Sequence, residues 1–161
     1  MANDRKTAIR DELVRAQRDL LAVLVSVRPG DWSLPTPNEG WAVRDVLTHL
    51  TTAETGFVGT LRRMASGQGG VPPDFDPNRW NAGQLRRRGE SEPDQLRSEL
   101  EAAHREMLEL LDSLDEDALD QRGHLSSGVE GSTEDNFRLV SDHKSRHTAD
   151  LRAALSTASR R

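Results

Sequence analysis

Hydrophobic residues recur at intervals of three or four along most of the chain, a spacing that predicts amphipathic α-helices. The first such stretch covers residues 4–27 and is followed by Pro29 and Gly30, which stop a helix. A turn-rich segment, residues 31–40, separates it from a second predicted helix at residues 42–65. The first part of the chain is therefore expected to form two long helices joined by an irregular connection.

The helical pattern weakens over residues 71–90, where three prolines indicate a long connection. Residues 78–88 are expected to be helical inside it. Ser91 is the predicted N-cap of a third long helix, in which apolar residues repeat nearly every 3.5 positions. That period is typical of an antiparallel bundle. A short turn is expected after this helix, at residues 115–119.

A polar loop with three glycines leads to the last helix, for which Ser132 or Thr133 is the expected N-cap and Ser156 the approximate end. The pattern contains no convincing pair of strands. Four long amphipathic helices with one elaborated connection predict an all-α four-helix bundle. At 161 residues, the chain is expected to form a single domain over residues 1–161.

Composition narrows the functional classes. A formal net charge of −5 argues against a nucleic-acid partner, whose phosphates favour a basic surface. No stretch approaches the roughly 20 apolar residues of a membrane span, and the polar N-terminus lacks a secretory apolar segment, so a cytoplasmic protein is expected. Cysteine is absent, and any thiol chemistry must therefore use a thiol brought in from outside.

Two histidines interrupt the apolar face of the last predicted helix. His143 and His147 fall in the same narrow sector as Val140, Leu151 and Ala154. Their i, i+4 spacing places both imidazoles within reach of one ion, and zinc and similar metals accept neutral imidazole. Histidines on a core face are more often ordinary hydrogen-bonded residues, but burying two unpartnered imidazoles costs free energy. The two histidines are therefore candidate ligands of one metal ion.

A catalytic metal site needs at least one further protein ligand. His49 lies at the flank of the buried stripe of the second helix, where it can point at a neighbouring helix. His104 lies at the edge of the third helix and is expected to be partly exposed. His124 falls in the glycine-containing loop and is expected to be solvated. Periodicity favours His49 over His104 only slightly.

Two segments that contain these histidines resemble a known family. Residues 40–50, GWAVRDVLTHL, resemble the G-W-x-V-x-D-x-L-x-H-L signature of the DinB-like superfamily, more closely its mycothiol-dependent maleylpyruvate isomerase branch. Residues 142–147, DHKSRH, resemble the second motif of that superfamily, and residues 80–88 resemble the linking segment of the branch. The similarity covers nearly the whole chain, with both motifs in the expected order.

The resemblance implies a four-helix bundle with up-down-down-up connectivity, for which the long segment between the second and third helices supplies the crossover. It also implies a divalent metal, zinc or nickel, held by His49, His143 and His147. Characterised members use a small thiol such as mycothiol or bacillithiol, and many bundles of the family form homodimers. The isomerase that names the branch carries a C-terminal domain beyond the part that this sequence matches.

Three functions remain open from these observations. The first is a thiol-dependent transferase or isomerase that acts on a small electrophile, because a thiol at the metal is deprotonated to a nucleophilic thiolate. The second is a non-catalytic, stress-related module that binds a metal or a small molecule. The third is a hydrolase that acts through metal-bound hydroxide. No catalytic residue is identified from the sequence.

Several residues are candidates for supporting roles. Asp150, three residues after the last of these histidines, is a candidate to orient an imidazole from outside the metal's ligand shell, or is a solvated carboxylate. Trp80 is a candidate wall of the substrate pocket. The arginine run at residues 86–88, Arg87 in particular, is a candidate to bind an anionic substrate, although such runs more often face solvent. Glu54 is left open between a general base and a salt-bridge partner.

Overall fold

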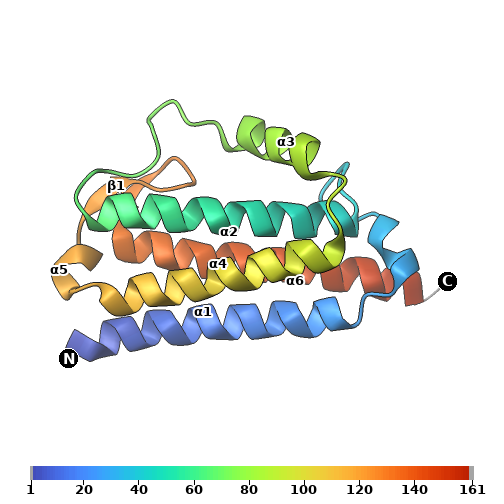
Figure 1. Ribbon diagram of the computed structural model, residues 1–161, viewed down its shortest axis with the longest axis horizontal. Helices are drawn as coiled ribbons and strands as arrows, with labels where there is room; N and C mark the ends of the chain where they lie inside the picture. Colours follow the sequence, from blue (N-terminus) through green and yellow to red (C-terminus); the bar gives the residue numbers. More distant parts are fainter. Residues whose placement is uncertain (1, 160–161) are drawn as a thin grey trace.

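The computed structural model describes residues 2–159, which form a bundle of four long helices (Figure 1). These helices are α1 (Ala2–Val25), α2 (Val43–Ala65), α4 (Pro93–Ser113) and α6 (Thr133–Ser159). The shorter elements, all in the connections, are η1 (Pro29–Ser33), α3 (Pro77–Arg88), α5 (Glu116–Leu119), β1 (Arg122–His124) and β2 (Glu130–Ser132). The predicted all-α four-helix bundle is confirmed, and the predicted helix ends agree to within a few residues.

Contacts between the helices give the direction in which each one runs. At the start of α2 the Arg44 guanidinium donates to the Ser91 carbonyl at 2.6 Å. About two turns further along α2, the Thr51 hydroxyl donates to the carbonyl of Leu96, which is also further along α4, at 3.0 Å. Helices α2 and α4 are therefore parallel neighbours. Helices α1 and α6 also run in parallel, opposite to the first pair, which is the up-down-down-up arrangement (Figure 1). The connection over residues 66–92 returns along the outside of the bundle and carries α3 with it.

The core consists of two apolar clusters, one in each half of the bundle. Every long helix contributes residues at three-to-four spacing to both, as the hydrophobic pattern predicts. The cluster near the start of α1 includes Ile9, Leu61, Met107, Leu111, Phe137 and Val140, and the other includes Leu20, Val46, Leu47, Leu50, Leu96, Leu100 and Leu151. The candidate metal residues lie on the helices between these two clusters.

The prediction of Ser91 as N-cap of α4 is wrong by one residue. The N-cap is Glu92, whose side chain makes no capping hydrogen bond and whose backbone is extended, with φ −70° and ψ 142°. Pro93 explains the difference, because proline favours the first helical position and drives the residue before it into an extended conformation. Ser132 does cap α6: its hydroxyl accepts from the Asp135 amide, and the Asp135 carboxylate accepts from the Ser132 amide.

The absence of a strand pair was also a wrong prediction. Strands β1 and β2 pair antiparallel, with Gly123 opposite Gly131, within the segment expected to be a loop. Each strand has three residues without an apolar alternation, so periodicity gives no signal. The predicted turn at residues 115–119 contains a one-turn helix, α5, capped by the Asp115 carboxylate.

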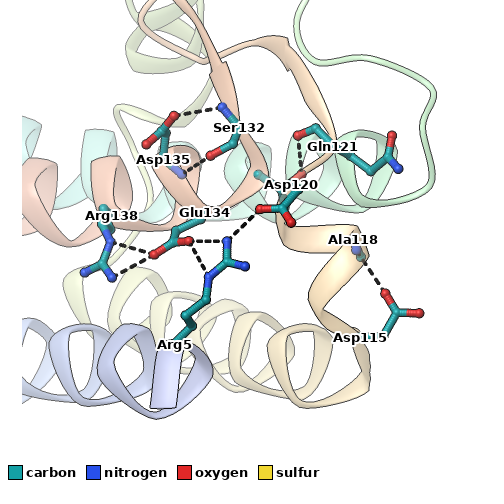
Figure 2. A network of polar contacts seen from close by, with 10 residues as sticks. Arg5, Asp115, Ala118, Asp120, Gln121, Ser132, Glu134, Asp135 and Arg138 are labelled. Atoms are coloured by element: carbon teal, nitrogen blue, oxygen red, sulfur yellow. Dashed lines mark hydrogen bonds and ion pairs between the residues drawn. The ribbon is translucent and has the colours of Figure 1, made fainter. Parts of the chain in front are cut away.

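Ion pairs hold the start of α1 against the start of α6 (Figure 2). The Arg5 guanidinium contacts Glu134 at 2.5 Å and Asp120 at 2.8 Å, and Arg138 joins Glu134 to Glu12. These contacts fix the parallel alignment of the two helices at the end of the bundle where the hairpin lies. Among the described helices, none combines the length and the apolar character that crossing a membrane requires.

Candidate metal centre

Three imidazoles converge between α2 and α6. His49 comes from α2, and His143 and His147 come from successive turns of α6. Their candidate ligand atoms all lie within 4.8 Å of one another, and Nε2 of His49 is 2.8 Å from Nε2 of His143. The ring centroids are 4.6–4.8 Å apart. The fold therefore brings together the three histidines that the sequence singled out.

The local environment keeps these imidazoles neutral. Burial is the main cause that lowers the pKa of His49 to about 3 and that of His143 to about 2, with neighbouring histidines adding to the effect. Burial also lowers the pKa of His147, while the nearby Asp150 carboxylate partly opposes that shift. Neutral imidazole is the form that binds a metal ion. Among the described residues, the buried Nδ1 atoms of His49 and His147 have no hydrogen-bond partner.

Asp150 lies beside the last histidine, as the sequence placed it. Its Oδ2 is 3.2 Å from Nδ1 of His147. The same oxygen accepts a hydrogen bond of 2.6 Å from the Asn38 side chain. Asn38 comes from the segment before α2, so this contact fixes the carboxylate at the edge of the imidazole. A carboxylate in this place can orient a ligating ring.

Aromatic rings pack around the histidines. The Trp41 ring lies 4.9 Å from that of His49 and 6.3 Å from that of His147, and Phe57 stands edge-on to His143 at 5.4 Å. Such contacts restrict the rotation of the imidazoles. Trp41 and Phe57 also line the cavity that opens beside the histidines.

His104 is not the partly exposed residue that the sequence predicted. It is buried, with 9% of its surface exposed, and its Nδ1 lies 3.9 Å from the Glu54 carboxylate. Glu54 itself is the salt-bridge partner of Lys144 rather than a free base. Periodicity placed His104 at the helix edge, but in the bundle that edge faces the Glu54 carboxylate of α2. His104 therefore belongs to the core and not to the three-histidine cluster.

A cavity of about 1100 Å³ opens beside the three histidines. Its walls come from α2, α6, α3 and the connection around α3, with two serines from the hairpin loop. Trp80 lines it as the sequence suggested, and the ring stands over Gly56 of α2, where an added Cβ would be 3.5 Å from the indole. Arg87, the predicted substrate residue, is exposed and outside the lining, whereas its neighbour Arg86 lies in it.

Sequence reasoning missed other residues that line the cavity, although a signal for them was present. On α2 the lining residues follow the first histidine at three-to-four spacing: His49, Ala53, Gly56, Thr60 and Arg63. On α6, Leu139, His143 and Arg146 do the same. Extending the stripe that contains each histidine, by about four turns on α2 and about one turn on α6, would have found them. The contribution of Phe75 from the α2–α3 connection has no such signal, because no periodicity places a loop residue.

Comparisons with known proteins agree with this fold. A family model described as the mycothiol maleylpyruvate isomerase N-terminal domain matches residues 13–152. No curated protein sequence gives a significant match. Among solved structures, YfiT from Bacillus subtilis, described as a probable metal-dependent hydrolase with an unusual four-helix bundle topology, aligns with a TM-score of 0.81 at 17% identity, over 99% of this chain and 90% of that one.

Two other solved structures are similar. The mycothiol-dependent maleylpyruvate isomerase aligns with a TM-score of 0.74 at 17% identity, over 94% of this chain but only 60% of the isomerase. An uncharacterised protein from Escherichia coli UTI89 aligns with a TM-score of 0.78 at 17% identity, over 96% of this chain and 94% of that one. At these identities the structural likeness establishes the shared fold alone.

Proposed function

Because the chain belongs to the mycothiol maleylpyruvate isomerase N-terminal domain family, a branch of the DinB-like superfamily, we propose that it is a metal-dependent enzyme that joins a small thiol to an electrophilic substrate. The observation that carries the proposal is the cluster of His49, His143 and His147 at the wall of a large cavity. Zinc and nickel are the metals that we expect.

The donor set suits such an ion. Burial keeps the imidazoles neutral. Their candidate ligand atoms lie within 4.8 Å of one another. Around a tetrahedral ion with bonds of about 2.0–2.1 Å, ligand nitrogens are roughly 3.3 Å apart, and small rotations of the side chains bring them to that distance. Three neutral ligands leave the positive charge of the metal uncompensated and a fourth position free. A divalent ion held there would lower the pKa of a thiol that reaches its open position.

The chain's own residues would prepare the site for this chemistry. Asp150 and Asn38 hold the orientation of the His147 ring, and Trp41 with Phe57 packs against the imidazoles at the wall of the cavity. The cavity volume of about 1100 Å³ exceeds what one small ligand needs. It therefore accommodates a thiol and an electrophile together. The absence of cysteine agrees with a nucleophile that arrives as a cosubstrate.

A hydrolase is the second candidate, since the structurally similar YfiT is described as a probable metal-dependent hydrolase. The same three histidines would then activate water instead of a thiol. The two functions differ in one requirement, because the hydrolase turns over without any thiol.

Metal content is the first measurement. The protein is purified without a metal-affinity tag and analysed by elemental mass spectrometry beside a His143→Ala/His147→Ala double variant and a His124→Ala control. We expect close to one zinc or nickel ion per chain in the wild type and the control, and none in the double variant. No metal in the wild type, even after zinc or nickel is added, contradicts the proposal.

Thiol dependence is measured next on the metal-loaded protein. Mycothiol or bacillithiol is incubated with a model electrophile, and the rate is compared with that of the free thiol and with that of the double variant. Acceleration that requires both metal and thiol supports the transferase or isomerase. Turnover of an ester or amide without thiol supports the hydrolase, and no acceleration in either assay leaves a metal-binding module.

A further inference from the structure

The cavity beside the histidines is elongated along α2. Its lining on that helix extends from His49 to Arg63, which is about 21 Å of α-helix. On α6 only the stretch from Leu139 onward lines it, beside the two histidines of that helix. The β1–β2 hairpin approaches the end of α2, where the Val71 amide donates to the His124 carbonyl at 2.9 Å. The cavity therefore runs from the metal centre towards the hairpin.

The two halves of this cavity differ in chemistry. The half next to the metal centre has an apolar lining that includes Ala53, Phe57 and Leu139. The half next to the hairpin adds hydroxyl and guanidinium groups, which come from Thr60, Arg63 and the two loop serines at positions 126 and 127. An apolar group of a ligand gains from burial in the first half but not in the second.

The indole of Trp80 lies at the boundary between these halves. Gly56 is seven positions after His49 and seven before Arg63, so it marks the middle of the α2 lining. A Cβ at Gly56 would be 3.5 Å from both Cη2 and Cζ2 of Trp80. This is van der Waals contact, so no ligand atom fits between the indole and α2 at this point.

Helix α3 holds the indole in this position above α2 (Figure 1). The Asp76 carboxylate caps the start of α3 by accepting from the Asn78 and Arg79 amides. At the other end, the Arg88 guanidinium pairs with the Glu99 carboxylate of α4 at 2.6 Å. The Phe75 ring, 6.5 Å from that of Trp80, packs beside the indole. The ring is thus supported by its own helix and by the connection before it.

We propose that Trp80 determines specificity by limiting the length of the group that a ligand bound at the three histidines can extend along α2. The inference rests on the proposed function in one respect, because the length is measured from a ligand held by the metal. From His49 to Gly56 the helix covers about 10 Å, and with C–C bonds of about 1.5 Å an extended chain of roughly five to eight carbons fills that distance. The ligand class that fits is one with a short apolar chain, which ends at the indole.

Straight-chain hydroxamates, from acetohydroxamate to dodecanohydroxamate, test this limit. Their head group binds zinc whether the enzyme uses a thiol or water, and isothermal calorimetry on the zinc-loaded full chain gives each Kd. We expect the Kd to fall by about two- to fourfold for each added methylene and then to stop falling when the chain reaches Trp80. Trp80→Ala and the more conservative Trp80→Leu should move this break to chains longer by about two carbons or more, and leave the Kd of acetohydroxamate unchanged within about twofold.

Trp32→Ala is the matched control. Trp32 lies in η1, packs against the apolar cluster at that end of the bundle, and is outside the cavity lining. It removes the same side chain, and the break should stay at the wild-type length. A wild-type Kd that keeps falling through dodecanohydroxamate, or a break at the same length in Trp80→Ala and Trp80→Leu, overturns the length limit and keeps the metal centre.

A metal-free arm separates this inference from the proposed function. Chelated protein is titrated with 1-alkanols from butanol to decanol, which enter the apolar half without a metal to hold them. We expect a break in this series as well, again at a longer chain in Trp80→Ala than in the wild type. That result in a protein that takes up no metal supports the length limit and contradicts the enzyme. If neither series binds, the apolar half accepts no chain and the inference is overturned.

Discussion

Nζ of Lys144 lies 2.9 Å from Oε1 of Glu54 in the centre of the bundle, where both residues are at most 2% exposed. The Gln17 side chain accepts a second hydrogen bond of 2.8 Å from the same ammonium group, and His104 faces the carboxylate from α4. Each long helix therefore contributes one residue to this polar cluster. Lys144 directly follows the first histidine of α6, so the ion pair fixes the register of α6 against α2 at the height of the metal centre.

Breaking this pair from one side should destabilise the protein strongly. Lys144→Met leaves the Glu54 carboxylate buried without its partner, and we expect the free energy of unfolding to fall by about 3–5 kcal/mol in urea denaturation. The double variant Glu54→Leu/Lys144→Met removes both charges and should recover most of that loss.

Arg97 and Glu101 provide the control, because this i, i+4 pair on α4 is partly exposed on both sides. Arg97→Met should lower the free energy of unfolding by less than about 0.5 kcal/mol. If the losses in the free energy of unfolding caused by Glu54→Leu and by Lys144→Met sum to the loss in the double variant, the Lys144–Glu54 contact does not couple the helices.

A metal ion bound by three histidines should stabilise the folded state. At a free concentration of 100 times the Kd, binding adds about 2.7 kcal/mol, which corresponds to a rise in Tm of about 5–10 °C for a chain of this length. We expect this shift in differential scanning fluorimetry of chelated protein after zinc or nickel is added. His143→Ala should abolish it, whereas His104→Ala, outside the cluster, should keep it even if its starting Tm is lower. An equal shift in His143→Ala would mean that the ion binds elsewhere.

Asp150 should control metal affinity without being a ligand. Asp150→Asn removes the negative charge 3.2 Å from Nδ1 of His147, and losses at such supporting positions are typically about 10- to 100-fold in metal affinity. Competition with a chromophoric chelator measures the Kd. Asp142→Asn is the control, because Asp142 is also on α6 but is exposed. If both variants bind metal equally well, Asp150 has no orienting role.

The metal-free protein should lose stability below pH 6.5. The imidazoles of His49 and His143 titrate near 6.5 in the unfolded chain, but burial lowers their pKa in the folded chain to about 3 and about 2. Between these values protons bind to the unfolded state and not to the folded one. The free energy of unfolding should therefore be constant above pH 6.5 and fall by up to about 1.4 kcal/mol per pH unit for each histidine below it.

Urea denaturation of chelated protein at pH 7.5, 6.5 and 5.5 measures this slope. The window lies above the range in which carboxylates with a lowered pKa, such as Glu134 and Asp135, lose their contribution on acidification. His143→Gln should flatten the profile, since it removes one of the titrating groups. A wild-type profile that stays level down to pH 5.5 contradicts the burial of neutral imidazoles.

The contrast between the two histidine pairs explains how far sequence reasoning extends. The i, i+4 spacing of His143 and His147 defines one face of one helix, so their pairing as ligands follows from local geometry. The choice between His49 and His104 depends on which helices are neighbours and how they are rotated, and periodicity left it nearly even. The family resemblance favoured His49, and the structure agrees because α2 faces α6 at this height while His104 turns towards Glu54.

The cavity marks the limit of that reasoning. The hydrophobic pattern located the helices of its walls but not the position of α3 over α2, which depends on the path of residues 66–76. Arg86 and Arg87 differ by 100° around α3, and only the docked helix decides that Arg86 lines the cavity. The hairpin gave no sequence signal either, and it contributes Ser126 and Ser127 to the same lining.

Gly70 should be essential for the outer wall of the cavity. A Cβ at this position would lie 1.8 Å from the His124 carbonyl oxygen, which also accepts a hydrogen bond of 2.9 Å from the Val71 amide. Gly70→Ala therefore forces the α2–α3 connection away from β1, and we expect a loss of about 2–3 kcal/mol in the free energy of unfolding, with faster proteolysis of the connection. Gly30→Ala is the control, because nothing lies within 4 Å of its Cβ.

The same substitution distinguishes the wall of the cavity from its metal centre. The three histidines lie on α2 and α6, whose packing does not involve residue 70, so Gly70→Ala should keep the Tm shift with zinc or nickel. The outer wall itself should loosen, since the connection that carries Val71, Pro72 and Phe75 forms part of the lining, and limited proteolysis of residues 66–76 measures that change. Loss of metal binding in Gly70→Ala would show instead that the connection supports the histidines, and would make the outer wall part of the metal centre.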